Sequence, residues 1–342
     1  MHPELFSFAL SPWLGLAIPA LGALAVAAAF AAVSRWQGEG LKNTLLIAPV
    51  WGLLGFLLLR NLAGASGTSR VAVPAYWVLD VSAFGLLIAL CLWTATRKGL
   101  SPRPLLAAAP LYIGTSLLLS RLLFLARDRF YHQPSPVDSV KAFLLSNQGA
   151  NTFMVVLGTT LGLTAYLSIK GLPRLPYLDV LYANAPLGLG LAKLGCFSAG
   201  CCWGLRSDSP LAVAFPPGSP AFRDQSLHGL IAWDAPAALP VLPVQLFETA
   251  SMVLLWAALR LVSRRPLKPG QLSCLFLFGY ALVQATMETM RGDPHRGGPV
   301  WGPSTAFYNI SMQHMLSFEF MLAAVVTTLW LRRSWQKQEV AA

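Results

Sequence analysis

The stretch QLSCLFLFGYALVQATMETMR, residues 271–291, decides the fold, because it combines a long apolar run with polar side chains at helical spacing. A helix that crosses a bilayer needs about 20 mostly apolar residues. Tyr280, Gln284, Glu288 and Arg291 recur at spacings of four, four and three, so they share one face of that helix. Such a face is costly against lipid, which predicts a membrane helix whose polar stripe faces the interior of a bundle.

The composition of the whole chain extends this prediction. Apolar residues make up 55% of the 342 residues and charged residues 11%, well below the roughly 25% of soluble domains. Stretches of suitable length predict an all-α polytopic membrane protein with about nine transmembrane helices. They lie near residues 13–33, 44–60, 77–95, 104–125, 151–169, 176–196, 244–262, 271–290 and 315–332.

The net charge of +11 is spread over short loops and forms no continuous stripe, so a nucleic-acid partner is excluded. Alternate loops each carry at least two basic residues, and they are 34–43, 96–103, 170–175, 263–270 and 333–342. The outer segment 126–150, with three basic residues, is the exception. Basic loops stay in the cytoplasm, so the N-terminus is expected outside and the C-terminus inside.

The predicted spans and loops also suggest a division of the chain. Residues 1–125 are expected to hold about four N-terminal transmembrane helices, and residues 126–342 a core of about five. Residues 203–243 within that core are rich in proline and glycine but retain many apolar residues. They are expected to form an extracytoplasmic loop or small cap.

The sharpest local motif is LAKLGCFSAGCCWG, residues 191–204, which places Lys193 in an apolar run ahead of Cys196, Cys201 and Cys202. Three thiols are soft metal ligands, but CxxxxCC is not a common zinc spacing and no histidine adjoins it. A thiolate nucleophile activated by Lys193 is a second hypothesis. Close packing of small residues is the third, and it suits at least two of the thiols. We therefore expect no metal and no cofactor.

A third motif, LPVQLFETAS at residues 242–251, puts Gln245 and Glu248 at the outer entry of its span. The predicted orientation brings these two residues to the level of the cysteine motif, Glu288 and Arg291. Three separated motifs thus converge on one site at the outer leaflet. Three other charged residues lie within spans, and they are Asp80, Asp179 and Arg121. Ion pairing or an interfacial position explains the two aspartates as well as a functional role does. Arg121 could extend to the headgroups or bind a lipid phosphate.

In this order the motifs resemble those of the prolipoprotein diacylglyceryl transferase family. The family signature GRxGNFxNxExxG corresponds to AKLGCFSAGCCWG here, with matches at Gly195, Phe197 and Gly204. The family's PSQLYE corresponds to PVQLFE, and its YGxxRFxxEFxR corresponds to YALVQATMETMR. The substitutions relative to the family are Lys193 for arginine, Cys196 for asparagine, Cys201 for glutamate and Gln284 for arginine. The family's HGG motif has no counterpart in residues 148–162, which lack histidine.

The resemblance implies an enzyme of the bacterial cytoplasmic membrane that moves a diacylglyceryl group from phosphatidylglycerol to a thiol of a preprolipoprotein signal peptide. The residues expected to act in catalysis are Lys193, Cys201, Tyr280, Gln284 and Glu288. Those expected to bind substrate are Cys196, Gln245, Glu248, Arg291 and Arg121. One alternative is a non-catalytic lipid-binding or lipoprotein-binding protein on the same scaffold. Another is a small-solute transporter, although the inverted repeats typical of transporters are missing from the sequence.

Overall fold

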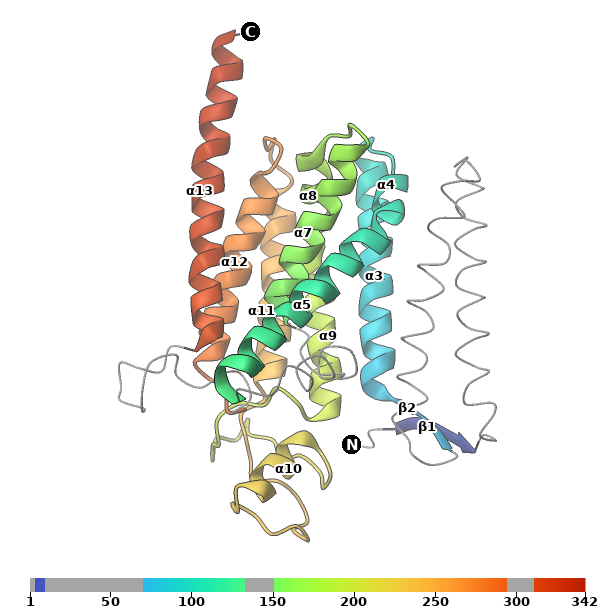
Figure 1. Ribbon diagram of the computed structural model, residues 1–342, viewed down its shortest axis with the longest axis vertical. Helices are drawn as coiled ribbons and strands as arrows, with labels where there is room; N and C mark the ends of the chain where they lie inside the picture. Colours follow the sequence, from blue (N-terminus) through green and yellow to red (C-terminus); the bar gives the residue numbers. More distant parts are fainter. Residues whose placement is uncertain (1–3, 10–69, 133–150, 294–310, 342) are drawn as a thin grey trace. The chain divides into compact units, whose positions relative to one another are not determined.

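The computed structural model describes residues 4–9, 70–132, 151–293 and 311–341 (Figure 1). The chain divides into two compact units. The first comprises Ala75–Leu100 with Pro173–Ala342, and the second His2–Pro74 with Ser101–Leu172. The predicted spans 13–33 and 44–60 lie outside the described residues. The boundary expected at residue 125 stays a prediction.

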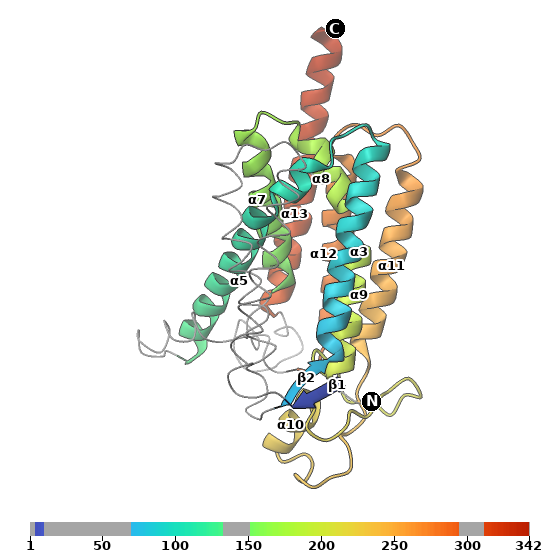
Figure 2. The same cartoon turned by 90° about the vertical axis from the view of Figure 1, so that its right-hand side faces the viewer.

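The first unit contains the predicted site and is a bundle of helices. Its elements are α3 (Ala75–Arg97), α8 (Arg174–Tyr182), α9 (Ala185–Ala199), α10 (Pro220–Leu227), α11 (Val244–Val262), α12 (Gln271–Glu288) and α13 (Met312–Ala341). α9 packs against both α3 and α11, and α12 packs against both α11 and α13 (Figure 2). Helix α3 thus packs with helices that follow it by about 100 residues or more. The elements around the site are therefore distant from one another in sequence.

The second unit holds β1 (Glu4–Ala9), β2 (Arg70–Pro74), α4 (Arg103–Ala107), α5 (Ala109–His132) and α7 (Thr152–Ile169). β1 and β2 form a two-stranded antiparallel sheet, which the all-α expectation did not include. α5 and α7 are joined by side-chain hydrogen bonds, because the Thr115 hydroxyl donates to the Gly158 carbonyl at 2.6 Å and the Ser116 hydroxyl to the Val155 carbonyl at 3.0 Å. Hydroxyl groups that bond across helices are typical of membrane interiors.

Six helical segments of the described chain are long and apolar enough to cross a membrane. They are Val78–Arg97, Ala109–Ala126, Thr152–Ile169, Arg174–Ala199, Val244–Val262 and Met312–Gln336. Each coincides with one of the predicted spans. The remaining described prediction, 271–290, forms α12 with 18 residues, but the polar stripe lowers its mean hydropathy and it is not among the six.

The predicted span 176–196 is interrupted, which the apolar pattern did not indicate. α8 ends at Tyr182 and α9 starts at Ala185, with Pro186 in its first turn. Proline lacks the amide proton that a continuous helix would need, and its ring clashes with the preceding turn. The Asn184 side chain fills the break, because its amide donates to the Val180 carbonyl at 2.8 Å and its oxygen accepts from Arg260 at 2.8 Å.

Residues 203–243 fold on a small core of their own. Buried apolar side chains meet there, namely Trp203, Phe215, Ala221, Phe222, Ala238 and Val241. Ser219 caps α10 by accepting a hydrogen bond from the Phe222 amide at 3.2 Å. The segment lies at the end of the bundle opposite the C-terminal end of α13 (Figure 1).

Candidate active site

A junction of three backbone segments brings the predicted motifs together. The Gly204 amide donates to the Leu242 carbonyl at 2.9 Å, just before α11. On the other side, the Leu205 amide donates to the Met290 carbonyl at 2.9 Å, and the Gly292 amide donates to the Trp203 carbonyl at 3.1 Å. The end of the cysteine motif is therefore held between the start of α11 and the end of α12, and the predicted convergence has a backbone cause.

Two glycines make this junction possible. A Cβ atom on Gly204 would lie 2.5 Å from Val244 Cγ2 and 2.7 Å from the Leu242 carbonyl oxygen. A Cβ atom on Gly292 would collide with the backbone of Gly204. Close approach of two backbones requires residues without side chains. The packing at the junction therefore accommodates only glycine at both positions.

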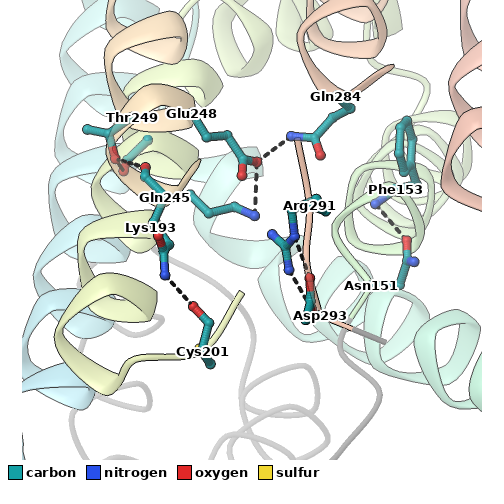
Figure 3. A network of polar contacts seen from close by, with 11 residues as sticks. Asn151, Phe153, Lys193, Cys201, Gln245, Glu248, Thr249, Gln284, Arg291 and Asp293 are labelled. Carbon is teal, nitrogen blue, oxygen red and sulfur yellow. Dashed lines mark hydrogen bonds and ion pairs between the residues drawn. The ribbon is translucent and has the colours of Figure 1, made fainter. Parts of the chain in front are cut away.

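Above the junction lies a buried chain of polar groups that joins three helices (Figure 3). The Lys193 ammonium of α9 lies 2.9 Å from the Glu248 carboxylate of α11. The Gln284 amide of α12 donates to the same carboxylate oxygen at 2.5 Å. Lys193 and Gln284, which replace two arginines of the family pattern, thus share one partner, and that partner is also buried.

Gln245 connects this polar chain to the cysteine motif. Its amide donates to the Cys201 carbonyl at 2.7 Å, and its side chain is fully buried. One turn later, the Thr249 hydroxyl donates to the Gly190 carbonyl of α9 at 2.9 Å (Figure 3). Among the described residues the Gln245 Oε1 atom has no hydrogen-bond partner. Gln245 therefore fixes the turn after α9 and presents one unused acceptor.

The three thiols of the cysteine motif form a cluster. The Sγ atoms of Cys196, Cys201 and Cys202 all lie within 4.8 Å of one another, and each residue is half-buried. Gly200 ends α9 in the left-handed conformation, and Cys202 adopts a φ of 63°, also left-handed. A non-glycine residue in this region costs about 1–2 kcal/mol. The turn that brings the three sulfurs together therefore contains a residue in an unfavourable backbone conformation.

The two thiols beyond the end of α9 differ in acidity. Hydrogen bonds from Cys196 and Cys201, aided by attraction to Arg291 and Lys193, hold the pKa of Cys202 well below its ordinary value. Hydrogen bonds to Cys196 and Cys202, together with burial, raise the pKa of Cys201. The Cys201 thiol donates a hydrogen bond to the Cys196 carbonyl at 3.6 Å. The catalytic role expected for Cys201 stays a prediction.

Arg291 has a different partner from the one that the helical spacing favours. Its Nε and Nη2 atoms donate to the two carboxylate oxygens of Asp293, each at 2.7 Å. Glu288 instead accepts a hydrogen bond from the Ser311 hydroxyl at 2.7 Å. Burial lowers the pKa of Arg291, but Cys202 and Asp293 outweigh that effect and raise it. Within the described chain, the buried Nη1 atom of Arg291 has no hydrogen-bond partner and remains available to an anion.

Three further residues singled out from the sequence lie on three different helices. Tyr280 is fully buried on α12, where its ring stacks on Phe276 with centroids 5.5 Å apart. Asp179 accepts hydrogen bonds from the Gly270 amide at 2.7 Å and from the amide and hydroxyl of Ser273, so it caps α12. Arg121 lies on α5 in the second unit, and its assignment to the site stays a prediction.

The structure adds two residues of α3 that sequence analysis did not assign to the site. Asp80 lies beside α9, since a Cβ atom on Gly195 would be 3.4 Å from its Oδ1 and 3.3 Å from the Tyr76 ring. Burial, Asp80 and the neighbouring cysteines raise the pKa of Tyr76. Asp80 drew attention only as a charge within a span, and no pattern in the sequence pairs α3 with α9.

Comparison with known proteins agrees with the order of the motifs. Residues 64–330 match the family described as prolipoprotein diacylglyceryl transferase. The phosphatidylglycerol–prolipoprotein diacylglyceryl transferase of Vibrio vulnificus is 27% identical over 268 residues, which cover 75% of this chain and 88% of the relative. The enzyme of the same name from Burkholderia thailandensis is 30% identical over 231 residues, covering 63% and 73% respectively.

A third relative matches over a shorter stretch. The phosphatidylglycerol–prolipoprotein diacylglyceryl transferase of Photorhabdus laumondii is 31% identical over 159 residues, so the chain spans about half the length of that relative, 52%. The family match, in contrast, includes all three motifs and most of the 342 residues. This chain belongs to the prolipoprotein diacylglyceryl transferase family.

Proposed function

We propose that this protein transfers a diacylglyceryl group from a phosphatidylglycerol-like phospholipid to an acceptor thiol at the outer leaflet of the bacterial cytoplasmic membrane. The observation that carries the proposal is the junction that joins Gly204, Leu242 and Arg291 and so brings all three family motifs to one end of the bundle. The acceptor would be the cysteine of a preprolipoprotein signal peptide, and the relatives are named as transferases of phosphatidylglycerol and prolipoprotein.

The proposed orientation has the N-terminus outside and the C-terminus in the cytoplasm. The site and the segment 203–243 lie at one end of the first unit, and the C-terminal end of α13 lies at the other (Figure 1). The loop between α11 and α12, at the C-terminal side of α11, carries Arg264, Arg265 and Lys268. A basic loop marks the cytoplasmic side, so the opposite end, with the site, would face outward.

The transfer step requires the acceptor sulfur to attack the glycerol carbon that bears the phosphate. A carbon–sulfur bond forms, the bond between that carbon and the phosphate oxygen breaks, and the glycerol phosphate leaves with the electron pair. The thiol proton must pass to a base. Charge develops on the leaving phosphate, so cations placed beside it lower the barrier.

Arg291 is the best candidate to hold the phosphate. Asp293 fixes its guanidinium with two hydrogen bonds, and Nη1 remains without a described partner. An arginine held in one orientation loses little conformational freedom when an anion binds. Lys193 adds positive charge, but Glu248 neutralises part of it. Lys193 and Gln284 would therefore act chiefly by ordering α9, α11 and α12 around the lipid headgroup.

Glu288 is the best candidate for the base. It is half-buried, carries a hydrogen bond from Ser311, and lies one turn before Arg291. Glu248, the other acidic residue of the motifs, joins α9, α11 and α12 through Lys193 and Gln284. Glu288 lies nearer to Arg291 along the chain, so its carboxylate would receive the proton while Arg291 holds the phosphate.

Purified protein in detergent, supplied with phosphatidylglycerol and a lipobox peptide, tests the proposal by the mass gained by the peptide. We expect transfer in the unaltered protein and a loss of about 100-fold in Arg291→Ala and in Glu288→Gln. Glu319→Gln, which changes an exposed carboxylate on α13, is the matched control and should retain full activity. No transfer by the unaltered protein, with bound phospholipid still present, would favour a lipid-binding role instead.

A further inference from the structure

The transfer step described above leaves one conspicuous cluster without a role. Cys196, Cys201 and Cys202 converge at the end of α9 although the proposed mechanism uses Glu288 as base and Arg291 as the phosphate ligand. All five cysteines of the described chain carry free thiols, and only these three lie together. The cluster therefore requires an explanation of its own.

We propose that Cys196, Cys201 and Cys202 bind one Cu(I) ion in a three-coordinate thiolate site. The geometry carries the proposal, because three sulfurs around a single ion at about 2.3 Å lie roughly 4 Å apart. The sulfurs here are already within 4.8 Å of one another. The sulfurs would have to approach one another by less than about 1 Å to reach that spacing.

The backbone of the turn supports a ligand-binding role. Cys201 and Cys202 follow the left-handed Gly200, and Cys202 is itself left-handed with a φ of 63°. Costly backbone conformations of this kind persist where the surrounding structure enforces them, and they concentrate at functional sites. The Gln245 amide fixes the turn through the Cys201 carbonyl at 2.7 Å. The sulfurs are thus held in place before any ion arrives.

The chemistry of the donors selects the ion. Thiolates are soft ligands that favour Cu(I) and zinc. The group of candidate ligands found in the described residues contains sulfur alone, with no imidazole and no carboxylate. Structural zinc sites take four protein ligands, whereas three thiolates complete a trigonal Cu(I) site. Lys193 lies on α9, the helix that carries Cys196, and Arg291 pairs with Gly204 just beyond the cysteine turn, so the two cations would offset the negative charge of the complex.

Metal binding at this cluster would release protons, because a cation binds thiolates and not thiols. All three residues are half-buried, so the cluster is not sealed deep within the bundle.

Metal binding can be measured directly on reduced, metal-free full-length protein titrated with Cu(I) against a chromogenic chelator. We expect one equivalent to bind, and the affinity of Cys202→Ala to fall on the order of 100-fold or more. Cys196→Ser and Cys201→Ser should each weaken binding as well, which keeps the test valid if one variant fails to fold. The matched control is the double variant Cys91→Ala, Cys274→Ala, which removes two buried thiols outside the cluster and should retain the full equivalent.

X-ray absorption on the loaded protein should show three sulfur neighbours around copper. Binding that persists in Cys202→Ala, a stoichiometry below one half, or uptake of Zn(II) without Cu(I) would each overturn the proposal. None of these measurements depends on lipid transfer, so the proposed transferase activity and the proposed metal site fail or succeed separately.

Discussion

The Lys193 ammonium and the Glu248 carboxylate lie 2.9 Å apart, with only 8% and 2% of their side chains exposed. Each charge is stabilised mainly by the other, because so little of either side chain is exposed to solvent. The net stabilisation from a buried pair is small, but removing one partner strands the other. The pair joins α9 to α11, and Gln284 extends the link to α12.

Replacing Lys193 by methionine is therefore expected to lower the free energy of unfolding by about 3–5 kcal/mol. The double variant Lys193→Met, Glu248→Gln should recover much of that loss, because it leaves no unpaired charge. Thermal and denaturant unfolding in detergent would measure the three variants. The control is Thr286→Ala, an exposed change on α12. Losses that simply add in the double variant would contradict coupling between the two residues.

The junction of the three motifs predicts a second effect, at Gly292. Substitution by alanine places a Cβ atom against the Gly204 backbone, which must then move. We expect the unfolding temperature to fall and lipid transfer to drop at least about tenfold, because the shift displaces Arg291 next to it. Gly85→Ala is the matched control, since a Cβ atom there meets no atom within 4 Å on α3. Equal behaviour of the two variants would show that the junction tolerates displacement.

Much of the architecture could be predicted from the apolar pattern alone. The described spans were located to within a few residues, because about 20 apolar residues in a row have few alternatives to a membrane helix. The convergence of the motifs was also predicted, since alternating loop charge assigns each motif to one end of the bundle. The break between α8 and α9 at Asn184 was not predicted, although Pro186 indicates a helix start at that point.

The details of the site were harder to predict because they depend on contacts between distant segments. The polar stripe of residues 271–291 does not include Asp293, which lies beyond α12 and binds the Arg291 guanidinium. Cys202 faces its neighbours only because of the left-handed turn after Gly200. Asp80 joins the site through the packing of α3 on α9, which no spacing along the chain encodes.

Asp179 provides a third prediction, which separates structure from catalysis. Its carboxylate accepts three hydrogen bonds at the start of α12. Asp179→Ala is expected to lower stability by about 1–2 kcal/mol, the usual effect of losing a helix cap. Transfer per folded molecule should be unchanged, because Asp179 lies at the end of α12 opposite Glu288. Activity lost without loss of stability would assign Asp179 to the reaction.

The acidity of Cys202 provides a fourth prediction, on the pH dependence of thiol labelling. Its pKa lies well below the ordinary 9.0, so the thiolate persists as the pH falls below that value. Iodoacetamide reacts with the thiolate, and labelling of Cys202 at pH 7 should therefore outpace labelling of Cys201. Mass spectrometry of peptides from timed reactions would distinguish the two neighbours.

The direction of the effect on stability follows from the same shift. A group whose pKa is lowered in the folded state adds stability that is complete above its unfolded pKa, near 9.0 for a thiol. That stability declines as the pH falls and is lost once the pH passes the folded pKa. Cys196→Ala removes the hydrogen bond that contributes most to the lowered pKa of Cys202, so it should move the labelling profile of Cys202 to higher pH. Cys91→Ala should leave the profile in place, and a profile of Cys202 centred near pH 9 in the unaltered protein would contradict the stabilised thiolate.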